Sequence, residues 1–190
     1  VLAETGSPAG ICGPQGPQCD VPISFIDTSL ELLKNYNWGR DQGMANFGGL
    51  ESKRLIEKEA IGVVGCITPW NVPLQINLAK IIPALSAGCS VVLKPAPDTP
   101  WSATLIGAAA NQTDIPDGII NIVPSSDPQS IGEQLVNDPR VDMISFTGST
   151  ATGRTIMSWA ARTVKKVFLE LGGKSANIIL DDADFSQALL

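Results

Sequence analysis

Polar groups of complementary chemistry stand directly after short apolar runs in this sequence. The amide Asn71 follows one run, the ammonium Lys94 ends the next, and the carboxylate Glu170 ends a later one. Between Lys94 and Glu170 lies a turn of small residues that includes Gly148 and Ser149. An amide can donate to a developing oxyanion, a carboxylate can accept a proton, and a small-residue turn before a helix can bind phosphate. These residues predict an active site beside a phosphate-binding turn.

The stretch 141–174 shows which elements must position these groups. Residues 141–146 form an apolar run of strand length, GSTATG forms the turn, and apolar residues over 156–164 follow with helical spacing. Residues 167–170 return to a strand that ends on Glu170. The same unit repeats upstream, with strands expected at 61–68, 89–94 and 118–123. Helices are expected through 78–85, stopping at 87–88, and at 101–111 and 127–137. Such alternation predicts a parallel sheet with helices on both faces, whose strand ends meet at one edge.

The first sixty residues lack this repeat. Residues 1–51 are predicted to be a helical and loop segment, with a helix at 20–36 and irregular structure at 37–50. Residues 52–60 alternate charged and apolar side chains, which predicts an exposed arm strand that contributes to a homo-oligomer contact. The α/β domain would then span 61–190. A last apolar strand is expected at 177–180, and a helix beginning at Asp184 is cut by the chain end, so a fragment of a longer protein is expected.

The composition argues against several classes of protein. The chain has 190 residues, is 44% hydrophobic and carries a formal net charge of −6, which argues against nucleic acid as a partner. No apolar run reaches membrane-spanning length and no signal-like segment is present, so a cytoplasmic protein without a membrane partner is expected.

The cysteines do not predict a metal site, because none forms a CxxC pair and the chain has no histidine. Cys66 and Cys89 lie in apolar runs and are predicted to be core residues. Cys12 and Cys19 lie in a Gly/Pro-rich loop where they could be exposed; a disulfide between them stays open as the less favoured alternative.

ITPWN, LKPA, FTGSTATG and LELGGKSANII, in this order, resemble the aldehyde dehydrogenase superfamily over residues 52–190, and 1–51 fit more loosely. The resemblance implies a Rossmann-like cofactor-binding domain, truncated at both ends and lacking the catalytic domain. It also implies oxidation of a small-molecule aldehyde to a carboxylic acid by NAD or NADP, through a thioester on a cysteine. Asn71 would stabilise the oxyanion and Glu170 would be the general base. The cofactor-binding residues would be Thr68, Pro69, Trp70, Lys94, Thr147, Gly148, Ser149, Thr152 and Leu171.

The sequence departs from the family pattern in ways that bear on activity. The family's nucleophilic cysteine lies downstream of Leu190, and none of the four cysteines here matches it, so the chain alone is expected to be inactive. Pro97 stands where the family often has a glutamate near the ribose, which leaves the choice between NAD and NADP open. Asp127 could partly restore discrimination against a 2′-phosphate.

Alternative interpretations remain for the same residues. Taken singly, Asn71 could cap a helix, Lys94 could be a solvated strand end, and Glu170 could form an ion pair. GSTATGRT also resembles a phosphate-binding P-loop with Arg154 in place of lysine, and NIILDD resembles a strand ending in a magnesium ligand, which would make the protein a nucleotide hydrolase. A non-catalytic cofactor-binding fragment is the third alternative.

Overall fold

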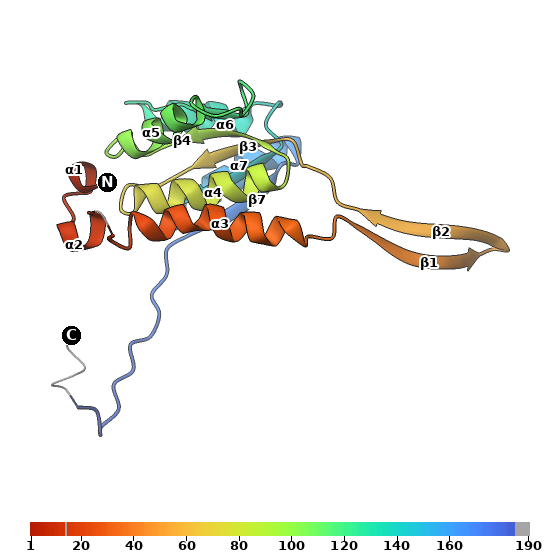
Figure 1. Cartoon of the computed structure of the whole chain (residues 1–190), viewed down its shortest axis with the longest axis horizontal. Coiled ribbons are helices and arrows are strands. Elements are labelled where there is room, and N and C mark those ends of the chain that lie inside the picture. The colour runs from red at the N-terminus through yellow and green to blue at the C-terminus, as the bar shows by residue number, and fades with distance from the viewer. Residues whose placement is uncertain (14, 185–190) are drawn as a thin grey trace.

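The computed structural model describes residues 1–13 and 15–184 (Figure 1). Its centre is a five-stranded sheet in the order β5-β4-β3-β6-β7, and every neighbouring pair of strands is parallel. The predicted fold class is therefore confirmed. The strands are β3 Val63–Ile67, β4 Ser90–Lys94, β5 Ile120–Ile122, β6 Met143–Thr147 and β7 Lys166–Glu170.

Helices cover both faces of this sheet. On one face α4 (Pro73–Ser86) and α5 (Trp101–Ala110) pack over a core that includes Cys66, Ile81 and Leu93. On the other face α6 (Pro128–Asn137) and α7 (Thr150–Ala160), followed by the 3-10 turn η1 (Ala161–Thr163), pack over a second core. The central strands β3, β4 and β6 are mostly buried, which explains why they read as continuous apolar runs rather than as alternating ones. In the edge strand β7 exposed and half-buried residues alternate.

Local signals in the sequence set the helix boundaries. Pro73 and Pro128 occupy the first turns of α4 and α6, where the missing N–H costs no helical hydrogen bond. Gly88 follows α4 with φ of +78°, a left-handed conformation that glycine adopts without strain. Because the five strands are parallel, the turn after each of them lies at the same edge of the sheet.

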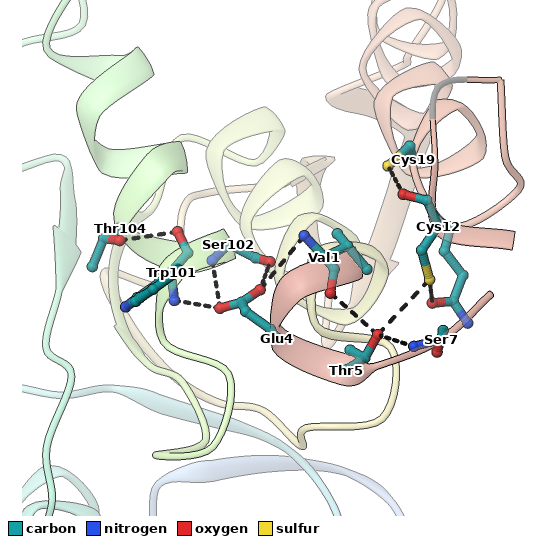
Figure 2. Close-up of polar contacts among 10 residues, drawn as sticks. Val1, Glu4, Thr5, Ser7, Cys12, Cys19, Trp101, Ser102 and Thr104 are labelled. Carbon is teal, nitrogen blue, oxygen red and sulfur yellow. Dashed lines mark hydrogen bonds and ion pairs between the residues drawn. The ribbon is translucent and has the colours of Figure 1, made fainter. Parts of the chain in front are cut away.

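The N-terminal segment forms α1 (Leu2–Thr5), α2 (Ala9–Cys12) and α3 (Asp20–Lys34), and α3 packs along α4. Figure 2 shows how this segment is fastened: the Glu4 carboxylate accepts hydrogen bonds from the backbone N–H groups of Trp101 and Ser102. A carboxylate at the start of α5 satisfies N–H groups that lack a partner within the helix.

Cys12 is only 3% exposed, so the expectation that it is exposed was wrong. The thiol of Cys12 donates to the side-chain oxygen of Gln18 at 2.9 Å, and the thiol of Cys19 donates to the Cys12 carbonyl at 3.1 Å (Figure 2). All four cysteines are free, so the disulfide alternative is not formed. Burial comes from the local folding of a segment that the sequence presents as a loop.

A long antiparallel hairpin projects from the body (Figure 1), formed by β1 (Gly39–Phe47) and β2 (Leu50–Glu57). The prediction of irregular structure at 37–50 was therefore wrong. Gly48 and Gly49 both have positive φ and form the tight turn, and Gly43 has positive φ at an irregularity in the pairing. The glycines that suggested irregularity are thus the residues that make the hairpin. All of β2 is exposed.

The apolar strand predicted at 177–180 is also wrong, because residues 171–180 form neither helix nor strand. Ile178 and Leu180 are 77% and 64% exposed, and Figure 1 shows this segment leaving the body. A strand needs a neighbouring strand for its backbone hydrogen bonds, and the described residues supply none here. The helix predicted from Asp184 lies almost wholly outside the described residues. In the described ranges, no helix is long and apolar enough to cross a membrane.

Candidate active site

The residues selected from the sequence lie at the carboxyl edge of the sheet. Lys94 is the last residue of β4 and Glu170 the last of β7, and Gly148 follows β6 directly. The backbone N–H of Gly148 donates to the Glu170 carbonyl at 3.0 Å, which ties the turn to the end of β7. The N–H of Thr68 likewise donates to the Lys94 carbonyl at 3.2 Å. Backbone bonds therefore hold the four strand ends in one row.

Two clefts open at this edge and share the rim residues Pro69, Thr147 and Gly148. The β7 cleft, about 940 Å³, lies between α4 and strands β6 and β7 and includes Asn71 and Glu170. The α7 cleft, about 600 Å³, lies between α6 and α7. Apart from the rim, it is lined by the predicted cofactor residues Thr68, Trp70, Lys94, Ser149 and Thr152. Leu171 lines the β7 cleft instead.

The turn between β6 and α7 is fixed by its own side chains. Ser149 caps α7: its Oγ accepts a hydrogen bond from the Thr152 N–H at 3.1 Å. A Cβ on Gly148 would lie 2.5 Å from the ring of Phe146, so only glycine fits there. The turn therefore brings a helix N-terminus, with its partial positive charge, to the floor of the α7 cleft.

Lys94 is only 4% exposed although it lines the α7 cleft. Its Nζ donates to the Pro95 carbonyl at 3.1 Å. Burial lowers the pKa of Lys94 below its usual value, because the charged form loses hydration. The solvated strand end that the sequence allowed is thus excluded.

In the β7 cleft Asn71 and Glu170 are both exposed side chains. Neither is buried by the described residues, so each is free to meet a ligand that enters the cleft. Among the described residues no ion pair includes Glu170, which removes the ion-pair alternative for it. Asn71 is also not the residue that precedes α4; that position belongs to Val72.

Lys80 is a site residue that the sequence reasoning missed. It is 8% exposed, lines the β7 cleft, and donates from Nζ to the Ser145 Oγ at 2.9 Å. Burial lowers the pKa of Lys80, while Cys66 and Glu170 oppose that shift. The pKa of the Cys66 thiol is raised to about 12, again mainly by burial. One signal was available: Lys80 is the only charged residue in the helical run PLQINLAKIIPALS.

Two further contacts position the predicted residues. The Thr68 hydroxyl donates to the side-chain oxygen of Asn77 at 2.7 Å, within the core beneath the shared rim. Leu171 packs on α7, where a Cβ on Gly153 would lie 2.6 Å from its side chain. Gly153 therefore lets the segment after β7 lie close against α7.

The geometry of the turn and helix argues against the nucleotide hydrolase alternative. A P-loop wraps a phosphate with the residues between its glycines, but here α7 already begins at Thr150 and Gly153 lies inside the helix. The proposed magnesium strand at 177–180 is not a strand. In the described part of the chain, no group of three or more His, Cys, Asp or Glu residues could hold a metal ion.

Comparison with known proteins decides the family. Residues 20–190 match the profile of the Aldehyde dehydrogenase family. This chain belongs to that family. It is 44% identical over 172 residues to the 3-succinoylsemialdehyde-pyridine dehydrogenase of a Pseudomonas species, an alignment that covers 90% of this chain and 34% of that protein.

Solved aldehyde dehydrogenases share the fold. The Mycobacterium tuberculosis enzyme complexed with NAD+ superposes with a TM-score of 0.86 at 36% identity, covering 96% of this chain and 36% of that one. A mutant of aldehyde dehydrogenase C from Pseudomonas syringae, complexed with NAD+ and octanal, gives 0.77 at 41% identity, covering 90% and 33%. The chain thus spans about a third of the length of the relatives it matches.

Proposed function

We propose that the complete protein oxidises an aldehyde to a carboxylic acid with NAD or NADP, and that residues 1–190 supply its cofactor-binding domain and part of its active site. The observation that carries the proposal is the pair of clefts meeting at Thr147 and Gly148. The α7 cleft has a helix N-terminus and the buried Lys94, and the β7 cleft has Asn71 and Glu170. Hydride transfer requires the cofactor and the aldehyde to meet, and the shared rim is where they would do so.

The α7 cleft fits a dinucleotide on its own chemistry. The start of α7 offers backbone N–H groups to a pyrophosphate, and the absence of a side chain on Gly148 lets the backbone approach closely. Lys94 would hydrogen-bond the adenosine ribose from the end of β4. Trp70 is 58% exposed on the rim and would contact the nicotinamide side, with Thr68, Pro69 and Leu171. The bound cofactor would supply the hydride acceptor.

In the β7 cleft, Asn71 and Glu170 would act in different steps of the reaction. The side-chain amide of Asn71 would donate to the oxygen on which negative charge develops when the aldehyde is attacked. Glu170 would accept a proton from the water that hydrolyses the thioester. Both side chains are exposed to the cleft and neither has to break an ion pair within the described residues.

The nucleophile would come from outside these 190 residues. Cys66 lies fully buried inside β3. Cys89 lines the β7 cleft but precedes β4, a five-residue strand, so it lies about 17 Å from the carboxyl edge. Cys12 and Cys19 lie in the N-terminal segment and line neither cleft. One thiol is fully buried, and the other three lie at the far end of β4 or outside both clefts, which supports the expectation that this chain alone is inactive.

The complete protein is further proposed to be a cytoplasmic homo-oligomer without a nucleic-acid or membrane partner. The β1–β2 hairpin supports the oligomer: Phe47 and Leu50 at its tip are 88% and 77% exposed, and isolated two-stranded hairpins are at best marginally stable. The four free cysteines support a reducing compartment. Light scattering of the complete protein, with and without Phe47→Ser and Leu50→Ser together, tests the role of the hairpin; an unchanged oligomer would remove it.

The test of the activity uses the complete protein with NAD+ or NADP+ and a panel of aldehydes that includes a semialdehyde and octanal, the chemistries named for relatives. Formation of reduced nicotinamide, followed by its absorbance, is the expected result. Hydrolysis of Mg-ATP, or no reduced nicotinamide with any aldehyde while the cofactor still binds, would contradict the proposal.

A further inference from the structure

Lys80 is a buried amine that forms no ion pair with the residues that the structure describes. Its Nζ contacts the Ser145 hydroxyl, and the ring of Phe168 lies 5.9 Å away at its centroid. Among the residues that the structure describes, no ion pair includes Lys80. A lysine that serves only packing or stability is normally paired when buried, because an isolated ammonium loses its hydration. Burial therefore lowers the pKa of Lys80 below its usual value.

The titratable groups around Lys80 come from three elements. Cys66 lies on β3, and burial raises the pKa of its thiol, which favours the protonated form. Glu170 and Lys166 on β7 line the same cleft, one of each sign. Glu59, which follows β2, also lines the cleft. Only Glu170 is identified as a charge that acts on Lys80 besides Cys66, and desolvation outweighs both in lowering the pKa of Lys80.

We propose that Lys80 captures aldehydes reversibly as an imine in the β7 cleft. The proposal rests on the proposed function only in taking the β7 cleft as the place where an aldehyde enters. Neutral, desolvated lysine amines are the nucleophiles that form Schiff bases with carbonyl compounds. Nothing in oxidation of an aldehyde requires such a step, so the imine would be a side equilibrium that holds aldehyde beside Asn71 and Glu170.

The reaction balances without any oxidant or reductant. The Nζ lone pair attacks the carbonyl carbon to form an N–C bond, and the carbonyl oxygen takes up a proton to become a hydroxyl. The carbinolamine then loses this hydroxyl as water, and the nitrogen loses its remaining proton to give a C=N bond. Asn71 and Glu170 line the same cleft as Lys80. In the proposed step Asn71 would donate to the carbonyl oxygen and Glu170 would carry the protons. Addition of water reverses every step and releases the aldehyde.

Lys94 is the matched control within the chain. It is also buried and its pKa is also lowered by desolvation, but it lines the α7 cleft and not the β7 cleft. If burial alone produced reactivity, the two lysines would react alike. If the β7 cleft selects aldehydes, Lys80 should react and Lys94 should be protected by a bound dinucleotide.

The experiment treats the 190-residue chain with octanal and cyanoborohydride near neutral pH, with saturating NAD+ present, and locates reduced adducts by peptide mass mapping. Lys80 should be modified several-fold faster than the exposed Lys34 and Lys53, and its modification should persist at lower pH than theirs. Ser145→Ala removes only the hydroxyl partner and should retain the reaction. Lys80→Arg keeps a cation and a donor to Ser145 but should give no adduct at position 80.

The proposal of an imine would be overturned if Lys80 is modified no faster than Lys34 and Lys53. This result would have to hold both in the folded wild-type chain and in Ser145→Ala. NAD+ binding is followed separately in the same sample. NAD+ binding without a Lys80 adduct overturns the imine and leaves the proposed function standing. A selective Lys80 adduct without NAD+ binding supports the imine and counts against the proposed function.

Discussion

The two clefts contain one buried lysine each, yet their surroundings differ. Lys94 ends β4 and donates to a backbone carbonyl beside the start of α7, whose backbone N–H groups provide a fixed partial positive charge. Gln129 and Glu133 also line that cleft. Lys80 lies in the middle of α4 and donates to a side-chain hydroxyl, in a cleft that also holds an amide and a carboxylate. Binding a cofactor calls for fixed partial charges, whereas chemistry calls for side chains that exchange protons. The comparison therefore supports the proposal that the cofactor binds in the α7 cleft and that the reaction takes place in the β7 cleft.

The largest expected effect on the reaction rate comes from substitutions in the β7 cleft. In the complete protein, Asn71→Ala should slow thioester formation about 10²–10³-fold, because the developing oxyanion loses a donor worth roughly 2.7–4 kcal/mol. Glu170→Gln should instead slow thioester hydrolysis, because an amide cannot accept a proton from water. Pre-steady-state absorbance of reduced nicotinamide distinguishes them: the burst is lost in Asn71→Ala and kept in Glu170→Gln. Loss of cofactor binding in both variants would contradict the division between the clefts.

A change on the shared rim should affect both clefts. Gly148→Ala places a methyl group against the ring of Phe146 and should cost about 1–3 kcal/mol of unfolding free energy as overpacking. It should also weaken NAD(P) binding, because the turn before α7 must shift. Gly173→Ala is the matched control, since a Cβ there meets nothing within 4 Å. Equal stability and equal NAD(P) affinity in the two variants would show that the turn is not tightly packed.

Replacing Lys80 or Lys94 should have different effects on NAD(P) binding but the same kind of effect on the pH dependence of stability. Lys94→Met should weaken NAD(P) binding and Lys80→Met should not, as calorimetric titration would show. Both lysines have a lowered pKa in the folded chain, so between that pKa and the usual value of 10.5 the unfolded chain binds more protons. Unfolding free energy should therefore rise with pH in that window, and each variant should flatten the rise. A fall with pH, or an unchanged slope in both variants, would contradict the buried, unpaired state.

The smallest expected effect concerns the choice of cofactor. Pro97 lines the α7 cleft with Lys94, and no carboxylate at position 97 repels a 2′-phosphate. NAD should be preferred only modestly over NADP, and Pro97→Glu should sharpen that preference in kcat/KM for the complete protein. If the ratio does not change, the discrimination belongs to Asp127, which caps α6 by accepting from the Ser130 N–H at 3.0 Å.

The α/β body was predictable because each of its strands and helices carries its own pattern. Strands buried on both faces read as apolar runs, and polar residues at their ends reveal the site edge. The hairpin was missed because Gly43, Gly48 and Gly49 have the same composition whether they make turns or irregular loops.

What the sequence could not show depends on tertiary contacts. Lys80 is buried by contacts with a strand more than sixty residues away, as its bond to Ser145 shows. Its place as the one charge in an apolar helical run singles it out, but the sequence does not show which strand buries it. The apolar run at 177–180 has strand character, but the described residues place no neighbouring strand beside it. Cys12 becomes buried only when Gln18 folds back against it.

The assignment of the cofactor to the α7 cleft can be tested directly with the four tryptophans of this chain. Trp70 and Trp159 line the α7 cleft, whereas Trp38 packs on Tyr36 at the base of the hairpin and Trp101 begins α5 beside Glu4. In a titration of the ¹⁵N-labelled chain with NAD+, followed by the indole N–H signals, Trp70 and Trp159 should shift together and saturate while Trp38 and Trp101 stay unchanged. Saturable shifts confined to Trp38 or Trp101, or no shift of Trp70 and Trp159, would contradict it.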